Sequence, residues 1–307
     1  MIRALSSLLL VAALTGTQAV QRQVIKVDVD LVNIYFTVCN KHGRLISNLD
    51  RANFAVYEDN NPQVITNFSR ETDVPLKLVL LIDTSGSVRY KLPFEQDVSV
   101  AFLNSVLRPG VDQASVVTFD SSIDLRQSYT DDQLLLASAV RRTRSGGATR
   151  LYDALSFLLN GTLTDGNGRR AIILLTDGDD NVSRSSPGEV MEAAQRNNVP
   201  IYVVSVNSIG IPADESNLRD STLEMFGTET GGKAFFPKRL KDLSSHLAAI
   251  SKELRSQYTI AYRSTNDKRD GSYRKIRIEV KNTQYSVRAR SGYYAPALSL
   301  VTAREAE

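Results

Sequence analysis

The stretch that decides the fold is an apolar run followed at once by oxygen-bearing side chains. Residues 78–82 read LVLLI, and residues 83–87 read DTSGS. A short continuous apolar run bounded by polar residues and glycine is typical of a buried strand. In open α/β sheets, ligands bind at the carboxyl ends of such strands. We therefore expect Asp83, Ser85 and Ser87 to lie at a binding edge.

Two further segments place oxygen atoms at corresponding points. Residues 145–149 read SGGAT and end just before a helical stretch, and residues 171–178 read AIILLTDG, a second buried strand followed by a carboxylate. The three segments together offer only oxygen ligands, and such a set suits a hard divalent cation such as magnesium, manganese or calcium. The candidate metal-site residues are Asp83, Ser85, Ser87, Thr149 and Asp177.

The middle of the chain, residues 75–254, alternates strand and helix patterns. This alternation predicts an α/β domain with a doubly wound, mostly parallel sheet covered by helices on both faces. Residues 122–125 are expected to form an antiparallel hairpin at the edge of the sheet. Asp131 and Ser186 are the expected N-caps of two helices, the second with Pro187 at the first helical position and Glu189 completing a capping box.

The two flanks of this domain are rich in strand patterns. Residues 24–74 and 255–295 each look too small to bury a core alone. We expect them to pair into one small β-sandwich-like module, with the α/β domain inserted between them, because the ends of a domain often lie close together. Residues 296–307 are read as a tail.

The first 19 residues have the pattern of a signal peptide: a short basic start, an apolar stretch and small residues at the cleavage position. The apolar run is too short for a span of about 20 residues, and no later segment is long enough. We expect an exported protein, periplasmic or extracellular, with no transmembrane span after cleavage.

Charge and the few Cys and His residues limit which other functions the sequence supports. The net charge is +3, although residues 255–294 carry ten Lys or Arg and only three Asp or Glu. These charges could form a basic face that binds lipid headgroups, nucleic acid or a polyanionic glycan. The favoured interpretation is that they lie on the solvated faces of strands. No nucleic-acid partner is expected. Cys39 is the single cysteine, so no intrachain disulfide forms. His42 and His246 lie far in sequence from the oxygen set, which disfavours histidine-based zinc sites and catalytic triads.

The five candidate residues match in type and order the metal-ion-dependent adhesion site of von Willebrand factor type A domains. This resemblance covers about residues 75–252. The flanks are similar to the secreted VWFA-related proteins typical of Acidobacteria; the segments that carry this likeness read YEDN at 57–60, NFSR at 67–70, DG at 270–271 and RARSGYYAP at 288–296.

The resemblance implies a role for each candidate residue. Ser85, Ser87 and Thr149 would be direct ligands of Mg²⁺ or Mn²⁺, with Ca²⁺ as an alternative. Asp83 and Asp177 would act directly or through water. A carboxylate from a partner protein would fill the open coordination position. The expected function is an exported, non-catalytic, adhesion-type module that binds a protein ligand of the cell envelope or extracellular space.

Two other functions stay open. The first is a structural scaffold in which the metal only stabilises the loops. The second is a metal-dependent phosphoryl-transfer enzyme with Asp83 as nucleophile. Phosphatases of the haloacid dehalogenase type carry the motif Asp-x-Asp at this point, and their second aspartate supplies the general acid. In this chain Ser85 stands at that second position, so the general acid is missing.

Overall fold

The computed structural model describes residues 31–70, 74–162, 168–207 and 217–297. All of them belong to one compact unit. The predicted signal peptide, the first residues of the N-terminal flank (24–30) and most of the C-terminal tail lie outside the described residues. Among the helices that are described, none is both long and apolar enough to cross a membrane.

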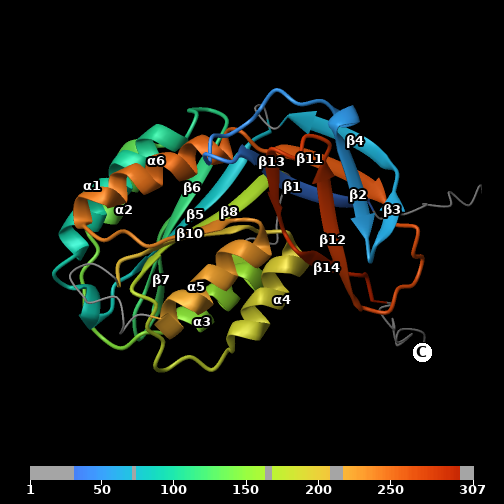
Figure 1. Ribbon diagram of the computed structural model, residues 1–307. Helices are drawn as coiled ribbons and strands as arrows, with labels where there is room; N and C mark the ends of the chain where they lie inside the picture. Colours follow the sequence, from blue (N-terminus) through green and yellow to red (C-terminus); the bar gives the residue numbers. More distant parts are fainter. Residues whose placement is uncertain (1–30, 71–73, 163–167, 208–216, 298–307) are drawn as a thin grey trace, which may run out of the picture. The chain divides into compact units, whose positions relative to one another are not determined.

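The centre of the fold is a six-stranded sheet in the order β10-β9-β8-β5-β6-β7 (Figure 1). The first five strands of this order pair in parallel, and β7 runs antiparallel to β6 at the edge. The expected doubly wound, mostly parallel sheet is thus confirmed. The strands are β5 (Leu76–Asp83), β6 (Gln113–Phe119), β7 (Ile123–Thr130), β8 (Arg169–Thr176), β9 (Ile201–Ser205) and β10 (Lys233–Phe235).

Helices cover both faces of this sheet (Figure 1). One apolar core lies between the sheet and helices α1, α2 and α6, and a second lies between the sheet and α3, α4 and α5. The near-continuous apolar sequence of β5 follows from this arrangement, because a strand covered on both faces buries successive side chains on opposite sides. The helices are α1 (Leu92–Val106), α2 (Gln133–Arg141), α3 (Leu151–Phe157), α4 (Pro187–Asn197), α5 (Asn217–Thr230) and α6 (Leu243–Leu254).

The helix caps agree with the sequence at α4 and differ at α2. Ser186 caps α4 through a capping box with Glu189, as predicted. At α2 the predicted cap, Asp131, is wrong. The side chain of Asp132 instead accepts the backbone N–H groups of the first turn, while Asp131 accepts the N–H of Gly110 at 2.9 Å. Asp131 and Asp132 could each cap the helix, but the side chain of Asp131 is bonded to the turn before β6.

The flanks form two four-stranded sheets, β13-β1-β11-β4 and β14-β12-β2-β3, that share one apolar core. Each sheet combines strands from before and after the α/β domain, as the expected fold class requires. The domain boundaries at residues 75 and 254 remain a prediction. The strands are β1 (Leu31–Asn40), β2 (Phe54–Glu58), β3 (Asn61–Gln63), β4 (Ile65–Arg70), β11 (Tyr258–Arg263), β12 (Tyr273–Val280), β13 (Tyr285–Ala289) and β14 (Gly292–Tyr294).

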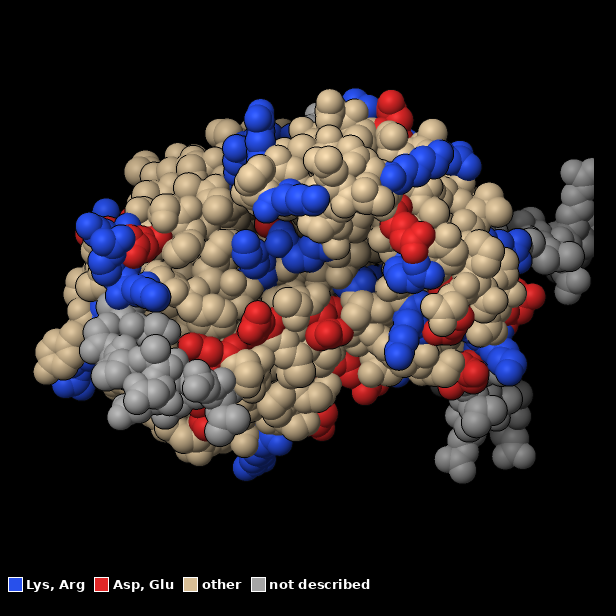
Figure 2. All heavy atoms as spheres, in the orientation of Figure 1, with Lys and Arg blue, Asp and Glu red and all other residues tan. Residues whose placement is uncertain are grey.

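Several basic residues of the C-terminal flank are engaged within the protein. Arg274 lies 3.4 Å from the buried carboxylate of Glu58, and Arg288 pairs with Glu253. Arg290 is buried and donates to the backbone oxygen of Gln195 at 2.9 Å. Figure 2 shows Lys and Arg interspersed with Asp and Glu over the face in view. Arg274 and Arg290 thus depart from the solvated strand faces expected for residues 255–294, whereas Arg263, Lys275 and Arg277 are exposed as expected.

Candidate metal centre

Asp83 is the last residue of β5, and both oxygens of its carboxylate are held in place. Oδ1 accepts the backbone N–H of Ser85 at 2.9 Å, and Oδ2 accepts the hydroxyl of Thr176 at 2.7 Å. Asp83 is fully buried. The first bond shapes the turn after the strand, and the second joins the carboxyl ends of β5 and β8. The carboxylate is therefore positioned by the sheet itself.

The two serines of the turn bring their hydroxyls together. The Oγ atoms of Ser85 and Ser87 are 3.0 Å apart. Ser85 is 1 % exposed, whereas Ser87 is exposed at the surface. A short 3-10 turn at Gly86–Val88 places both side chains on the same side of the loop. One residue of the pair is therefore buried and the other lies at the surface.

The loop that carries Thr149 is bonded directly to this turn. The N–H of Gly146 donates to the oxygen of Thr84 at 2.7 Å, and the N–H of Gly86 donates to the oxygen of Gly147 at 3.2 Å. Gly147 has a φ of +83°, and a Cβ there would lie 2.6 Å from the Oγ of Ser121. Only glycine fits this point without strain. Thr149 follows two residues later and is 2 % exposed.

The loop after β8 completes the edge. Asp177 is 5 % exposed. Asn181 accepts the N–H of Thr149 at 3.0 Å through its side chain and donates its own N–H to the oxygen of Thr149 at 3.2 Å. Asp180 accepts the N–H of Leu151 at 2.8 Å, at the start of α3. Sequence reasoning missed both positioning roles, because each bond joins residues about thirty positions apart.

The electrostatics of the centre favour a bound cation. The pKa of Asp83 is raised to about 6, chiefly by burial and then by the nearby carboxylate of Asp177, against the hydrogen bonds from Ser85 and Thr176. Two carboxylates at a buried edge repel each other, and a divalent cation between them would remove that repulsion. The donor set contains only carboxylates and hydroxyls, which fits Mg²⁺ or Mn²⁺ better than a soft metal.

The structure therefore places all five predicted residues on three loops at one edge of the sheet. Their roles as metal ligands remain a prediction. Across the described residues there is no group of three or more His, Cys, Asp or Glu side chains arranged to hold a metal ion. A cation at this edge would thus depend on the hydroxyls of Ser85, Ser87 and Thr149 in addition to the two carboxylates.

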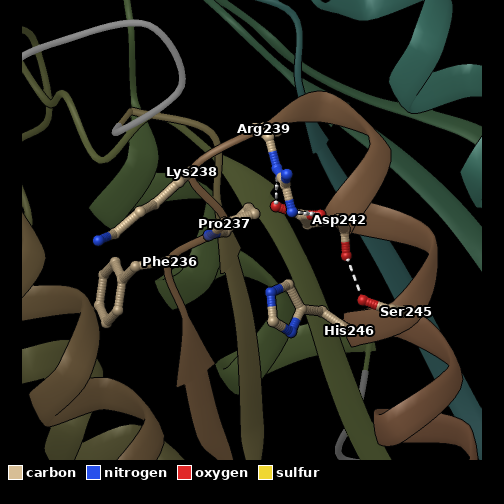
Figure 3. Close-up of a pocket in the computed structure, with 7 residues that line it drawn as sticks. All are labelled: Phe236, Pro237, Lys238, Arg239, Asp242, Ser245 and His246. Atoms are coloured by element: carbon tan, nitrogen blue, oxygen red, sulfur yellow. Dashed lines mark hydrogen bonds and ion pairs between the residues drawn. The ribbon is translucent and has the colours of Figure 1, made fainter.

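A separate pocket of about 500 Å³ opens beside β10 and α6 (Figure 3). Arg239 is paired with Asp242 at 3.0 Å, and burial lowers the pKa of His246. Figure 3 shows the side chain of Lys238 extending toward Phe236 and away from His246. The polar groups of this pocket do not converge on one point, which distinguishes it from the edge described above.

The fold and the oxygen-lined edge define a class of protein. The model of the von Willebrand factor type A domain matches residues 77–251, which is more than half of the chain. The chain belongs to this family, and the expected resemblance to von Willebrand factor type A domains is confirmed. The likeness of the flanks to the secreted proteins of Acidobacteria stays a prediction. Domains of this family commonly bind protein ligands through a divalent cation at a metal-ion-dependent adhesion site. No curated protein matches the chain.

Solved structures agree on the fold. Proximal thread matrix protein 1 from the mussel byssus is 17% identical with a TM-score of 0.52, over 64% of this chain and 50% of that one. A point mutant of the PilB minor pilin from Streptococcus sanguinis is 13% identical with a TM-score of 0.50, over 61% and 62%. A second structure of the mussel protein, 18% identical with a TM-score of 0.50 over 61% and 50%, has a zinc-occupied adhesion motif. The match thus covers less than two thirds of each of these structures.

Proposed function

We propose that this protein is an exported, non-catalytic module that binds a protein ligand through a divalent cation, Mg²⁺ or Mn²⁺, held by Asp83, Ser85, Ser87, Thr149 and Asp177. One observation carries the proposal: three loops bring two buried carboxylates and a pair of hydroxyls to the carboxyl edge of the parallel sheet, with Ser87 at the surface. Export rests on the signal-peptide pattern of residues 1–19.

The partner is a protein of the cell envelope or extracellular space that presents a carboxylate. Hydroxyl ligands are neutral, so they leave the positive charge of the cation available to an acidic group from outside. Tyr90, three residues after Ser87, is 93 % exposed. An exposed tyrosine beside the site supplies the apolar contact area that is enriched at protein interfaces.

The alternative of a metal-stabilised scaffold is less well supported. The loops are already joined by their own backbone bonds, from Gly146 to Thr84, from Gly86 to Gly147 and between Asn181 and Thr149. Their arrangement therefore does not require the metal. A phosphoryl-transfer role would need a general acid two residues after Asp83, and this chain has Ser85 there, whose hydroxyl is a poor proton donor.

The test compares capture from an exported protein fraction by immobilised wild-type protein and by Asp83→Ala. The same partner should be retained by the wild type in magnesium, and lost both with a chelator and with the variant. Retention by the chelated wild type and by the variant would contradict the adhesion role. A chelator that lowers only the melting temperature, with capture unchanged, would favour the scaffold.

A further inference from the structure

One buried acidic residue near the candidate centre has no assigned role. Glu95 lies in the first turn of α1 and is fully buried. Neither of its carboxylate oxygens has a hydrogen-bond partner among the described residues. Leaving a buried polar group unpaired costs about 1–3 kcal/mol, and more for a charged one, so such a group in a native fold calls for an explanation.

Glu95 faces the sheet from the inner side of α1. It lies on the same buried stripe as Leu92, Ser99 and Phe102, spaced by three or four residues along the helix. This stripe packs in the core that also contains Ile82, the residue before Asp83. A glutamate therefore stands at an apolar position of a helix that packs on the sheet face to which β5 contributes.

The charges around Glu95 come from the candidate centre. The pKa of Glu95 is raised to about 8, chiefly by burial, next by the Asp83 carboxylate and to a smaller extent by the Asp177 carboxylate. Lys91 acts in the opposite direction. The Lys91 ammonium is fixed by a 2.6 Å hydrogen bond to the backbone oxygen of Val206. Without a cation, the Glu95 carboxyl group is therefore protonated at neutral pH, and a divalent cation nearby would favour its ionised form. The three ionised carboxylates and one ammonium would then leave two negative charges, which one divalent cation balances.

We propose that Glu95 is a positioning residue of the metal centre: its buried carboxylate supplies a third negative charge that, together with Asp83 and Asp177, retains the divalent cation from the interior side of the sheet edge. This inference rests on the proposed metal site. The three carboxylates are not grouped as a common set of ligands within the described residues. Glu95 therefore acts on the cation through its charge and through the polar groups between them, as residues that support metal ligands without binding the metal do.

The test is calorimetric titration of the full-length protein with Mn²⁺. Glu95→Gln keeps the shape of the side chain and removes its charge, and it should weaken Mn²⁺ binding by about 10–100-fold. Ser99→Ala is the matched control, because Ser99 is also buried, also unpartnered among the described residues and one turn further along α1. Ser99→Ala should bind Mn²⁺ as the wild type does.

Thermal melting in a chelator separates charge from packing. Metal-free Glu95→Gln should melt no lower than the wild type, because it replaces a buried carboxyl group that has no hydrogen-bond partner among the described residues. Glu95→Met, of similar length and without polar atoms, should show the same weakened Mn²⁺ binding, and it decides the question if Glu95→Gln folds poorly. Equal Mn²⁺ affinity in wild type and either folded variant, or equal weakening by Ser99→Ala, would overturn the inference. A wild type that binds no Mn²⁺ would instead refute the metal site itself.

Discussion

The hydroxyl of Thr176, the last residue of β8, donates a 2.7 Å hydrogen bond to Oδ2 of Asp83, the last residue of β5. Both side chains are fully buried. The two strands are neighbours in the sheet and pair in parallel. The pairing of β5 and β8 therefore orients the carboxylate of Asp83. The loops that carry the hydroxyls of the candidate centre lie around this fixed carboxylate.

Thr176→Val should weaken Mn²⁺ or Mg²⁺ binding by about 10–100-fold, because the variant keeps the shape of the side chain and loses the bond that orients Asp83. Thr84→Val is the control. Thr84 follows Asp83 directly in the sequence and is nearly buried, but its hydroxyl donates to the backbone oxygen of Phe119 at 3.1 Å. Calorimetry should show near-normal metal affinity for Thr84→Val. Equal losses in both variants would mean that general packing, and not orientation of Asp83, sets the affinity.

Gly147→Ala should disturb the loop that carries Thr149. Its φ of +83° and the 2.6 Å approach of a Cβ to Ser121 would force the loop to move, with a strain of about 1–3 kcal/mol. We expect lower stability in denaturant unfolding together with weaker metal binding. Gly146→Ala is the neighbouring control, because a Cβ added at Gly146 would meet nothing within 4 Å. If both variants behave like the wild type, the loop does not depend on Gly147.

The five candidate residues could be proposed from local patterns: four of them stand at or after the end of an apolar strand, and Thr149 stands just before a helical stretch. Glu95 could not, since a single glutamate in a helical stretch usually faces solvent. The rotation of α1 about its axis decides the burial: the helix begins at Leu92, and its buried face then includes position 95. The contact of Asp180 with Leu151 could not be predicted either, because the two residues lie 29 positions apart and local patterns carry no signal for it.

Stability should depend on pH through Asp112, which joins β6 to its neighbours. Burial raises the pKa of Asp112, but hydrogen bonds from Arg108, Leu76 and Arg255 outweigh it and hold the pKa below its usual range. A carboxyl with a lowered folded-state pKa stabilises the fold above its unfolded value of about 4, and this contribution is lost as pH falls. Asp112→Ala should therefore cost about 3 kcal/mol at neutral pH.

The pH series checks the cause. The difference in unfolding free energy between wild type and Asp112→Ala should shrink as pH falls below about 4. Asp97→Ala is the control, because the ion pair of Asp97 with Arg141 is exposed on both sides and should contribute less than about 1 kcal/mol. A difference for Asp112→Ala that stays constant with pH would point to packing alone.

Glu58 tests whether the two flanks form one module. Its buried carboxylate accepts hydroxyls of Tyr262 at 2.8 Å, Tyr293 at 2.9 Å and Ser264 at 2.6 Å, all from the C-terminal flank. Glu58→Ala should cost about 3–5 kcal/mol. Hydrogen exchange should then accelerate in β2 and β12 together. The exposed Glu279 of β12, changed to alanine, should leave both strands protected. Faster exchange in β2 alone would argue for independently stable flanks.

The central claim is that the oxygen-lined edge holds one divalent cation, and a crystal structure of the protein with Mn²⁺ tests it most directly. The account predicts a single anomalous peak at the carboxyl ends of β5 and β8. Direct ligation by the hydroxyls of Ser85, Ser87 and Thr149 should place their oxygens about 2.1–2.2 Å from that peak. Saturating Mn²⁺ without a peak at this edge, or a peak from which the Thr149 hydroxyl points away, would contradict it.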